Sequence, residues 1–244
     1  MSAPATLPAV VIRAVFFDWG NTLAAWEFDP ELFVEGHVRG LAALGPQAPA
    51  QEAFTAAFGE QILPLLLGPG EDEVDYASAV GSLLDSLGVG ADDDAVWRFV
   101  EAEHLCWRPV HRIEPDVLGL LDTVRDRGLK VGLVSNVFDP PSLMRGLFAE
   151  IGLLERLDAV ALSTEVGKRK PHQAIFESAL RQAGVLPTEA VMVGDRLRED
   201  VGGAQKAGLA AIQAVWFERD GSGAATPSAI AESPADVLRW LGTT

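Results

Sequence analysis

Short runs of consecutive apolar residues recur along the chain and lack the polar alternation that marks a half-exposed strand. Strands that are covered on both faces, as in a parallel sheet, have this pattern. We therefore predict five buried strands. They are Val10–Phe17, Leu129–Val134, Leu157–Leu162, Ala190–Val193 and Ala210–Val215.

Between these runs, apolar residues recur every three or four positions, which is typical of amphipathic helices. The segment "PHQAIFESALRQAG" has one apolar face and ends at Gly184, a natural residue to follow a helix. "REDVGGAQKAGL" has a weaker pattern that ends at Gly208, and Asp139 before two prolines indicates a helix N-cap. Strands that alternate with helices predict an α/β fold with a doubly wound parallel sheet.

Residues 29–112 interrupt this alternation, because they contain helical patterns and no convincing strand. Connectors rich in glycine and proline separate the patterns. We predict an α-helical cap domain over 29–112, inserted into an α/β core that consists of 1–28 and 113–244. The expected cap helices are centred on Glu31–Leu44, Gln51–Leu67, Val74–Leu87 and Ala95–Trp107.

Composition restricts the possible partners. The 244 residues carry a formal net charge of −16, so nucleic acid and anionic membranes are not expected partners. The acidic runs "GEDEVD" and "ADDD" are expected to be solvated loops or helix starts. Cys106 is the one cysteine, so it forms no intrachain disulfide and is expected in the core on a helix. We see no signal peptide and no apolar run long enough to span a membrane, and we expect a cytoplasmic protein.

Chemically active side chains follow four of the predicted strands. Ligands of parallel sheets bind beyond the carboxyl ends of the strands, so these side chains are expected to meet at one edge. They are Asp18 after the first strand, Ser135 and Asn136 after the second, Lys170 in the loop after the third, and Asp195 with Asp200 after the fourth.

These residue types predict phosphoryl chemistry. Crowded carboxylates repel one another unless a cation lies among them, and oxygen ligands without histidine or cysteine suit Mg²⁺. Asp18 is the candidate nucleophile, which would form an aspartyl-phosphate intermediate. Ser135, the backbone N–H of Asn136 and Lys170 would bind the other phosphoryl oxygens.

The motifs "FFDWGNTL", "LVSN", "RKPHQAIF" and "GDRLRED" resemble, in this order, those of the haloacid dehalogenase-like (HAD) hydrolase superfamily. The resemblance covers essentially the whole chain and implies a Rossmann-like core with a helical cap. It also implies Mg²⁺ held by Asp18, the backbone carbonyl of Gly20 and Asp195, with Asp200 behind them or bound through water. We expect a phosphatase with a small phosphorylated substrate, as a monomer or homodimer.

One position departs from the pattern of the phosphatases in this family. They carry a second aspartate, which acts as general acid and base, at the position where this chain has Gly20. The next position, usually a glycine in this family, is Asn21 here. Loss of such a group costs roughly 10²–10⁴ in rate, most for alkyl phosphates, whose leaving group needs a proton. The candidate substitutes, chosen by position, are Glu27, Asp29, His37 and His111.

Three other interpretations compete. The 2-haloacid dehalogenases also lack the second aspartate, but Asp195 and Asp200 would repel a carboxylate substrate, and Arg39 is only a weak counterpart of their cap arginine. The phosphonoacetaldehyde hydrolases have a similar first motif but need a cap lysine, and residues 22–112 contain none. A non-catalytic module that binds a phosphorylated ligand or a protein stays open, although it would have no need of the nucleophile Asp18.

Overall fold

The computed structural model describes residues 11–242, and its centre is a six-stranded sheet in the order β5-β4-β1-β6-β7-β8. All neighbouring strands of this sheet are parallel. The predicted α/β class with a parallel sheet is therefore confirmed. The strands are β1 (Ala14–Phe17), β4 (Lys130–Ser135), β5 (Ala159–Leu162), β6 (Ala190–Gly194), β7 (Ala210–Ala214) and β8 (Ala229–Ala231).

Three of the five predicted strands begin at or within one residue of the predicted position. The first was predicted from Val10, which lies outside the described residues, and the third begins at Ala159, two residues later than predicted. The strand β8 was not predicted, because three residues give too little pattern to be distinguished from a loop.

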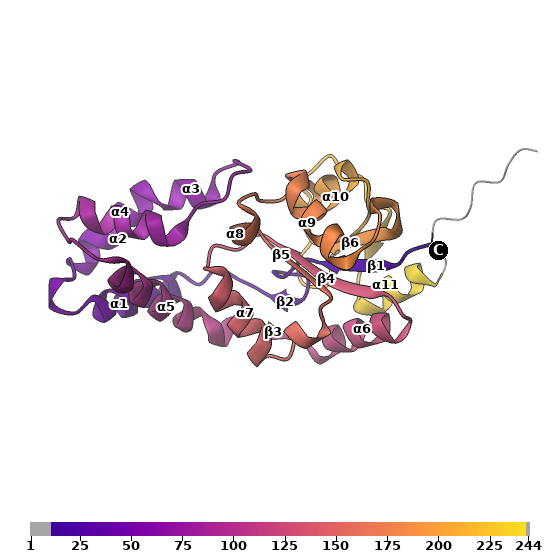
Figure 1. Ribbon diagram of the computed structural model, residues 1–244, viewed down its shortest axis with the longest axis horizontal. Coiled ribbons are helices and arrows are strands. Elements are labelled where there is room, and N and C mark those ends of the chain that lie inside the picture. Colours follow the sequence, from indigo (N-terminus) through magenta and orange to yellow (C-terminus); the bar gives the residue numbers. More distant parts are fainter. Residues whose placement is uncertain (1–10, 243–244) are drawn as a thin grey trace, which may run out of the picture.

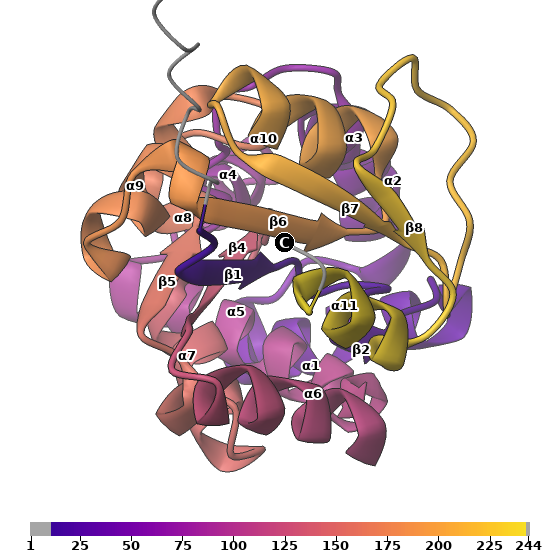
Figure 2. The same cartoon turned by 90° about the vertical axis from the view of Figure 1, so that its right-hand side faces the viewer.

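Helices cover both faces of the sheet, as Figure 2 shows. On one face lie α6 (Pro115–Asp126), α7 (Pro141–Glu150) and α11 (Pro234–Leu241), and on the other lie α9 (Gln173–Ala183) and α10 (Gly203–Lys206). Side chains of β1 alternate between the two layers, with Phe17 in the first and Phe16 in the second. Both are fully buried, which explains why the strand has no polar alternation.

The three helix predictions for the core have different outcomes. The helix α9 ends before Gly184, which has a φ of 67°, as predicted. The weaker pattern is a π-helical turn over Leu197–Gly202 followed by α10. The prediction that Asp139 is an N-cap is wrong. Pro140 has an extended backbone and occupies the N-cap position of α7. One carboxylate oxygen of Asp139 lies instead 3.2 Å from Nδ1 of His104.

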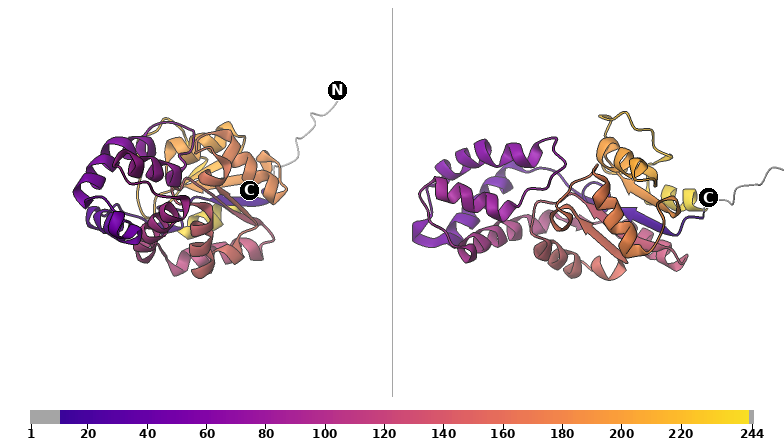
Figure 3. Two further views of the ribbon diagram at one scale, coloured as in Figure 1. Left: turned by 60° about the vertical axis from the view of Figure 1, so that its left-hand side comes forward. Right: turned by 45° about the horizontal axis from the view of Figure 1, so that its top comes forward.

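The helices α1–α5 form a separate bundle at one end of the molecule (Figures 1 and 3). This bundle has its own apolar core, with Phe54 and Phe99 at its centre. The predicted helix Gln51–Leu67 is broken at Ile62, because Pro64 starts a new helix. The helices are α1 (Pro30–Leu44), α2 (Gln51–Gln61), α3 (Leu63–Leu67), α4 (Tyr76–Ser86) and α5 (Asp93–Trp107).

The chain leaves and re-enters the core through a two-stranded antiparallel ribbon of β2 (Ala24–Ala25) and β3 (Arg112–Ile113). The chain therefore enters and leaves the bundle at two points that lie side by side. We call this bundle the cap. Its limits of 29 and 112 stay a prediction. Asp75 and Asp92 cap α4 and α5, as expected for helix starts. Short helical turns complete the fold: Gly45–Gln47, Arg108–Val110, Leu154–Arg156, α8 (Ser163–Val166) and Pro187–Glu189.

Cys106 is buried on α5, as expected. Within residues 11–242, no helix combines the length and the apolarity that a membrane crossing requires.

Candidate active site

Asp18 lies directly beyond the carboxyl end of β1, where its amide still donates to Val193 of β6 at 2.9 Å. The chain then turns sharply at Asn21, which has a φ of 53°. Asparagine tolerates this left-handed conformation better than most residues. Its side chain also stabilises the turn, because Oδ1 accepts from the amide of Trp26 at 2.9 Å and Nδ2 donates to Glu218 at 2.9 Å. The first motif thus ends one strand and places Asp18 at the sheet edge.

The predicted partners of Asp18 meet it there. Nζ of Lys170 lies 2.7 Å from Oδ1 of Asp18 and 2.6 Å from Oδ1 of Asp200. The hydroxyl of Ser135 donates to the same Asp18 oxygen at 2.9 Å. All four residues are at most 8% exposed, so these interactions occur in a poorly hydrated environment, where they are stronger than in water.

Asn136 has a contact that its sequence position did not suggest. Its side-chain Oδ1 accepts from the amide of Lys170 at 2.7 Å, and its Nδ2 donates to the carbonyl of Lys170 at 3.2 Å. The second and third motifs are therefore joined by a pair of hydrogen bonds that fixes the backbone of Lys170. The role of the Asn136 amide toward a phosphoryl group stays a prediction.

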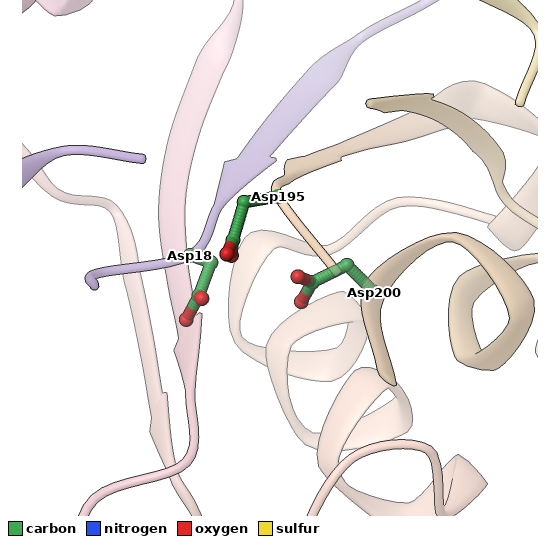
Figure 4. Close-up of side chains that lie close together, drawn as sticks. All are labelled: Asp18, Asp195 and Asp200. Atoms are coloured by element: carbon green, nitrogen blue, oxygen red, sulfur yellow. The ribbon is translucent and has the colours of Figure 1, made fainter. Parts of the chain in front are cut away.

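Three carboxylates, those of Asp18, Asp195 and Asp200, converge with oxygens within 4.8 Å of one another (Figure 4). Oδ2 of Asp200 accepts from the amide of Arg196 at 3.0 Å. Oδ1 of Asp195 is buried and has no hydrogen-bond partner among the described residues. An orphaned buried carboxylate oxygen is costly, which indicates that it is positioned for a ligand.

Gly194 permits this arrangement. A Cβ at this position would lie 2.3 Å from Cγ of Asp200, so any side chain would displace that carboxylate. The glycine at the end of β6 is therefore required for the close packing of Asp200.

Burial and mutual repulsion raise the pKa of Asp195 to about 8 and that of Asp200 to about 6. For both residues desolvation is the main cause; the charge of Asp18 also raises both pKa values, and Lys170 lowers both. Burial by itself would lower the pKa of Lys170, but the charges of Asp18 and Asp200 outweigh it and raise that pKa. The ammonium is thus held charged, whereas the carboxylates resist full ionisation without a further cation.

The donor set fits Mg²⁺. Three ionised carboxylates against one ammonium leave two negative charges, which one divalent cation offsets. The donors are oxygens, and the described residues within the cluster include no histidine or cysteine. Asp18 and the orphaned oxygen of Asp195 are the residues that would hold the ion. The Gly20 carbonyl stays a predicted ligand.

The suggested substitutes for the missing acid lie elsewhere or have other contacts. Asp29 caps α1, and Glu27 is exposed. His37 is fully buried inside the cap, where desolvation lowers its pKa to about 4. The ring centroid of His111 lies 5.9 Å from that of Trp19, and burial lowers the pKa of His111.

Position 20, where the missing acid would lie, has free space around it. A Cβ on Gly20 would meet no heavy atom within 4 Å, so a side chain fits there. Arg39, the weak counterpart of a dehalogenase arginine, is paired with Glu35 on its own helix at 2.8 Å. Its guanidinium is therefore engaged on the surface of α1.

Sequence reasoning missed one residue beside the site and one polar cluster inside the cap. Arg169, next to Lys170, is buried and binds the cap. Tyr76, His37 and Glu103 form a buried polar cluster inside the cap. Nothing in the spacing of these residues indicates that they meet.

The family model for haloacid dehalogenase-like hydrolases matches residues 12–208. Among curated proteins, the chain is 40% identical over 105 residues to a phosphoserine phosphatase of Thermus thermophilus, covering 43% of this chain and 40% of that protein. It is 34% identical over 134 residues to a glyceraldehyde 3-phosphate phosphatase of Methanopyrus kandleri, covering 54% and 55%. The chain thus spans about half the length of these relatives.

A solved structure, that of a HAD phosphatase from Thermococcus onnurineus, aligns with a TM-score of 0.64. At 23% identity, it covers 95% of this chain and 98% of that one, which shows the shared fold. Together with the match of the family model, this means that the chain belongs to the haloacid dehalogenase-like hydrolase family.

Proposed function

We propose that this protein is a Mg²⁺-dependent phosphatase that hydrolyses a small phosphorylated metabolite through an aspartyl-phosphate at Asp18. One observation carries the proposal: the ammonium of Lys170 bridges Asp18 and Asp200 beside the unpartnered oxygen of Asp195. Simple ligand binding would not require a buried carboxylate held in this way. The relatives named phosphoserine phosphatase and glyceraldehyde 3-phosphate phosphatase support the substrate class.

The residues divide the reaction among them. The Asp18 carboxylate attacks phosphorus, a P–O bond to Asp18 forms, and the P–O bond to the leaving group breaks. Lys170 and Ser135 already donate to Asp18, and they would also donate to the phosphoryl oxygens as charge moves between them. When bound, Mg²⁺ supplies charge neutralisation that lets an anionic nucleophile approach an anionic phosphate. Water then hydrolyses the acyl phosphate and regenerates Asp18.

Gly20 shapes the expected substrate preference. No side chain at this position protonates the leaving oxygen, so the leaving group must depart without that help. Acyl and aryl phosphates have leaving groups that need no proton, and we expect them to be hydrolysed faster than alkyl phosphates. The substrate is therefore best sought among phosphates with acidic leaving groups.

We also propose a cytoplasmic location and a monomer or homodimer as the active form. The net charge of −16 disfavours phosphate-rich polymers as partners, and small phosphates are the ligands that the site fits.

The test is turnover of p-nitrophenyl phosphate and acetyl phosphate with Mg²⁺ by the wild type and by Asp18→Asn. We expect the variant to lose at least about 10³-fold in rate, because the nucleophile is removed. Equal rates for the two proteins would refute catalysis by Asp18. Halide release from 2-chloropropionate without metal would favour a dehalogenase, and a stable partner with no turnover would favour a binding module.

A further inference from the structure

The loop between α3 and α4 of the cap reaches across to the core beside α8 (Figure 1). Two backbone hydrogen bonds join it to the segment before Lys170. The amide of Arg169 donates to the carbonyl of Glu71 at 2.8 Å, and the amide of Glu73 donates to the carbonyl of Gly167 at 3.2 Å. Together these two hydrogen bonds make Asp72 and Lys168 an isolated antiparallel bridge pair. The cap is therefore bound to the lysine motif itself.

The side chain of Arg169 strengthens this contact. Its guanidinium donates to the carbonyls of Leu66 at 2.5 Å and Leu65 at 3.4 Å, and Nε lies 3.8 Å from the Glu73 carboxylate. Arg169 is 8% exposed, so these interactions are shielded from water. Losing one partner of a buried charged hydrogen bond is more costly than losing an exposed ion pair.

Arg169 also lies near the loop that follows the second motif. Its guanidinium carbon lies 5.4 Å from the ring centroid of Phe138, two residues after Asn136. Asn136 in turn clamps the backbone of Lys170. Arg169 thus contacts the cap on one side and the loop after the second motif on the other, and it directly precedes Lys170.

We propose that Arg169 is a positioning residue that couples docking of the cap to the placement of Lys170. The inference rests on the proposed function, because it assigns phosphate binding to Lys170. Since coupling is reciprocal, phosphate binding at the core stabilises the docked cap loop, and the docked loop strengthens phosphate binding. Without the Arg169 guanidinium, the two events become independent.

The experiment compares Arg169→Gln with Lys168→Gln, which removes an exposed ion pair to Asp72 in the same loop. Hydrogen exchange of peptides over residues 65–73 is followed with Mg²⁺, with and without inorganic phosphate, and phosphate inhibition of turnover is measured. In the wild type, phosphate slows this exchange. In Arg169→Gln, exchange is about 10-fold faster, phosphate no longer slows it, and the inhibition constant rises about 10-fold. In Lys168→Gln, each quantity stays within about 2-fold of the wild type.

Two further variants separate coupling from a purely structural role. Arg169→Lys keeps the charge and gives intermediate values. Glu73→Gln weakens the contact from the cap side. In the double variant with Arg169→Gln, the factor by which the phosphate inhibition constant rises differs from the product of the two single-variant factors.

Several results would overturn the proposal. One is an Arg169→Gln protein whose exchange and inhibition match those of Lys168→Gln. Another is weaker phosphate binding with unchanged exchange, which would mean that Arg169 binds the anion directly. Wild-type exchange that does not respond to phosphate would also refute coupling. Exchange requires no turnover, so these outcomes are distinct from failure of the phosphatase proposal, which leaves wild-type and Asp18→Asn rates equal.

Discussion

The core and the cap each bury a carboxylic acid among polar side chains, and the two environments differ in how that acid is stabilised. At the sheet edge, Asp18 and Asp200 share the ammonium of Lys170. In the cap, Glu103 accepts a hydrogen bond from the Tyr76 hydroxyl, and Nε2 of His37 lies 3.6 Å from its other oxygen.

The cap cluster is built to be uncharged. Burial raises the pKa of Glu103 to about 8 despite the hydrogen bond from Tyr76, and burial lowers the pKa of His37 to about 4. At neutral pH the acid and the imidazole are therefore both mainly neutral. The aromatic rings of Phe33, Phe54 and Phe58 surround His37 and supply no charge.

The comparison shows that a buried carboxyl group does not by itself identify a catalytic centre. In the cap, burial suppresses the charge, which is a structural solution. In the core, a fixed cation lies among three carboxylates that need a further cation to ionise fully, and one carboxylate oxygen has no partner among the described residues. This is the environment in which a metal ion and a nucleophile are expected to function.

The largest expected difference in turnover is between Asp195→Asn and Glu103→Gln, two isosteric changes that each remove one buried acid. Asp195→Asn should lower Mg²⁺-dependent turnover by about 10²–10³-fold, because it replaces the charged oxygen proposed to bind the metal. Glu103→Gln should stay within about 3-fold, since a neutral acid becomes a neutral amide. Steady-state rates over a range of Mg²⁺ concentrations measure both. A comparable loss in both variants would remove the distinction between the two clusters.

A smaller effect is expected at Gly20. Gly20→Asp should raise turnover of alkyl phosphates by up to about 10²-fold and that of aryl phosphates much less, because only the former need a proton on the leaving oxygen. The open space around this residue accommodates the side chain. The matched control is Gly20→Ala, which adds bulk without an acid. Equal gains on both substrate classes would show that the missing proton donor does not belong at this position.

The third expected effect is on stability and not on turnover. Because the folded-state pKa of Glu103 is raised above 4.5, the stability that it contributes is complete below about pH 4.5 and is lost as the pH rises to about 8. The free energy of unfolding of the wild type should therefore fall relative to that of Glu103→Gln by about 1.4 kcal/mol per pH unit in this window. Denaturant titrations at several pH values, with a chelator present, measure this difference. A pH-independent difference would contradict a buried neutral Glu103.

Much of the candidate site at the sheet edge could be predicted from the sequence, because strand ends are visible in the pattern. An apolar run that stops at Asp18 or Asp195 fixes where the strand ends, and parallel pairing then brings these ends together. The same reasoning placed Ser135 and Lys170, which the structure brings into contact with Asp18.

The cap cluster could not be predicted in this way. His37, Tyr76 and Glu103 come from three helices, and helix periodicity indicates which face is apolar but not which faces meet. Arg169 was missed for a similar reason, since its hydrogen-bond acceptors are backbone carbonyls, which have no sequence signature. Asp139 was misassigned because the N-cap of α7 is the next residue, Pro140.

The most direct test of the central claim is chemical trapping of the intermediate. The protein is mixed with ³²P-labelled acetyl phosphate and Mg²⁺, quenched rapidly in acid, digested and mapped by mass spectrometry. We predict label on the peptide that contains Asp18, lost in Asp18→Asn and when the metal is chelated. Steady turnover with label on another residue, or with no labelled protein at all, would contradict Asp18 as the nucleophile.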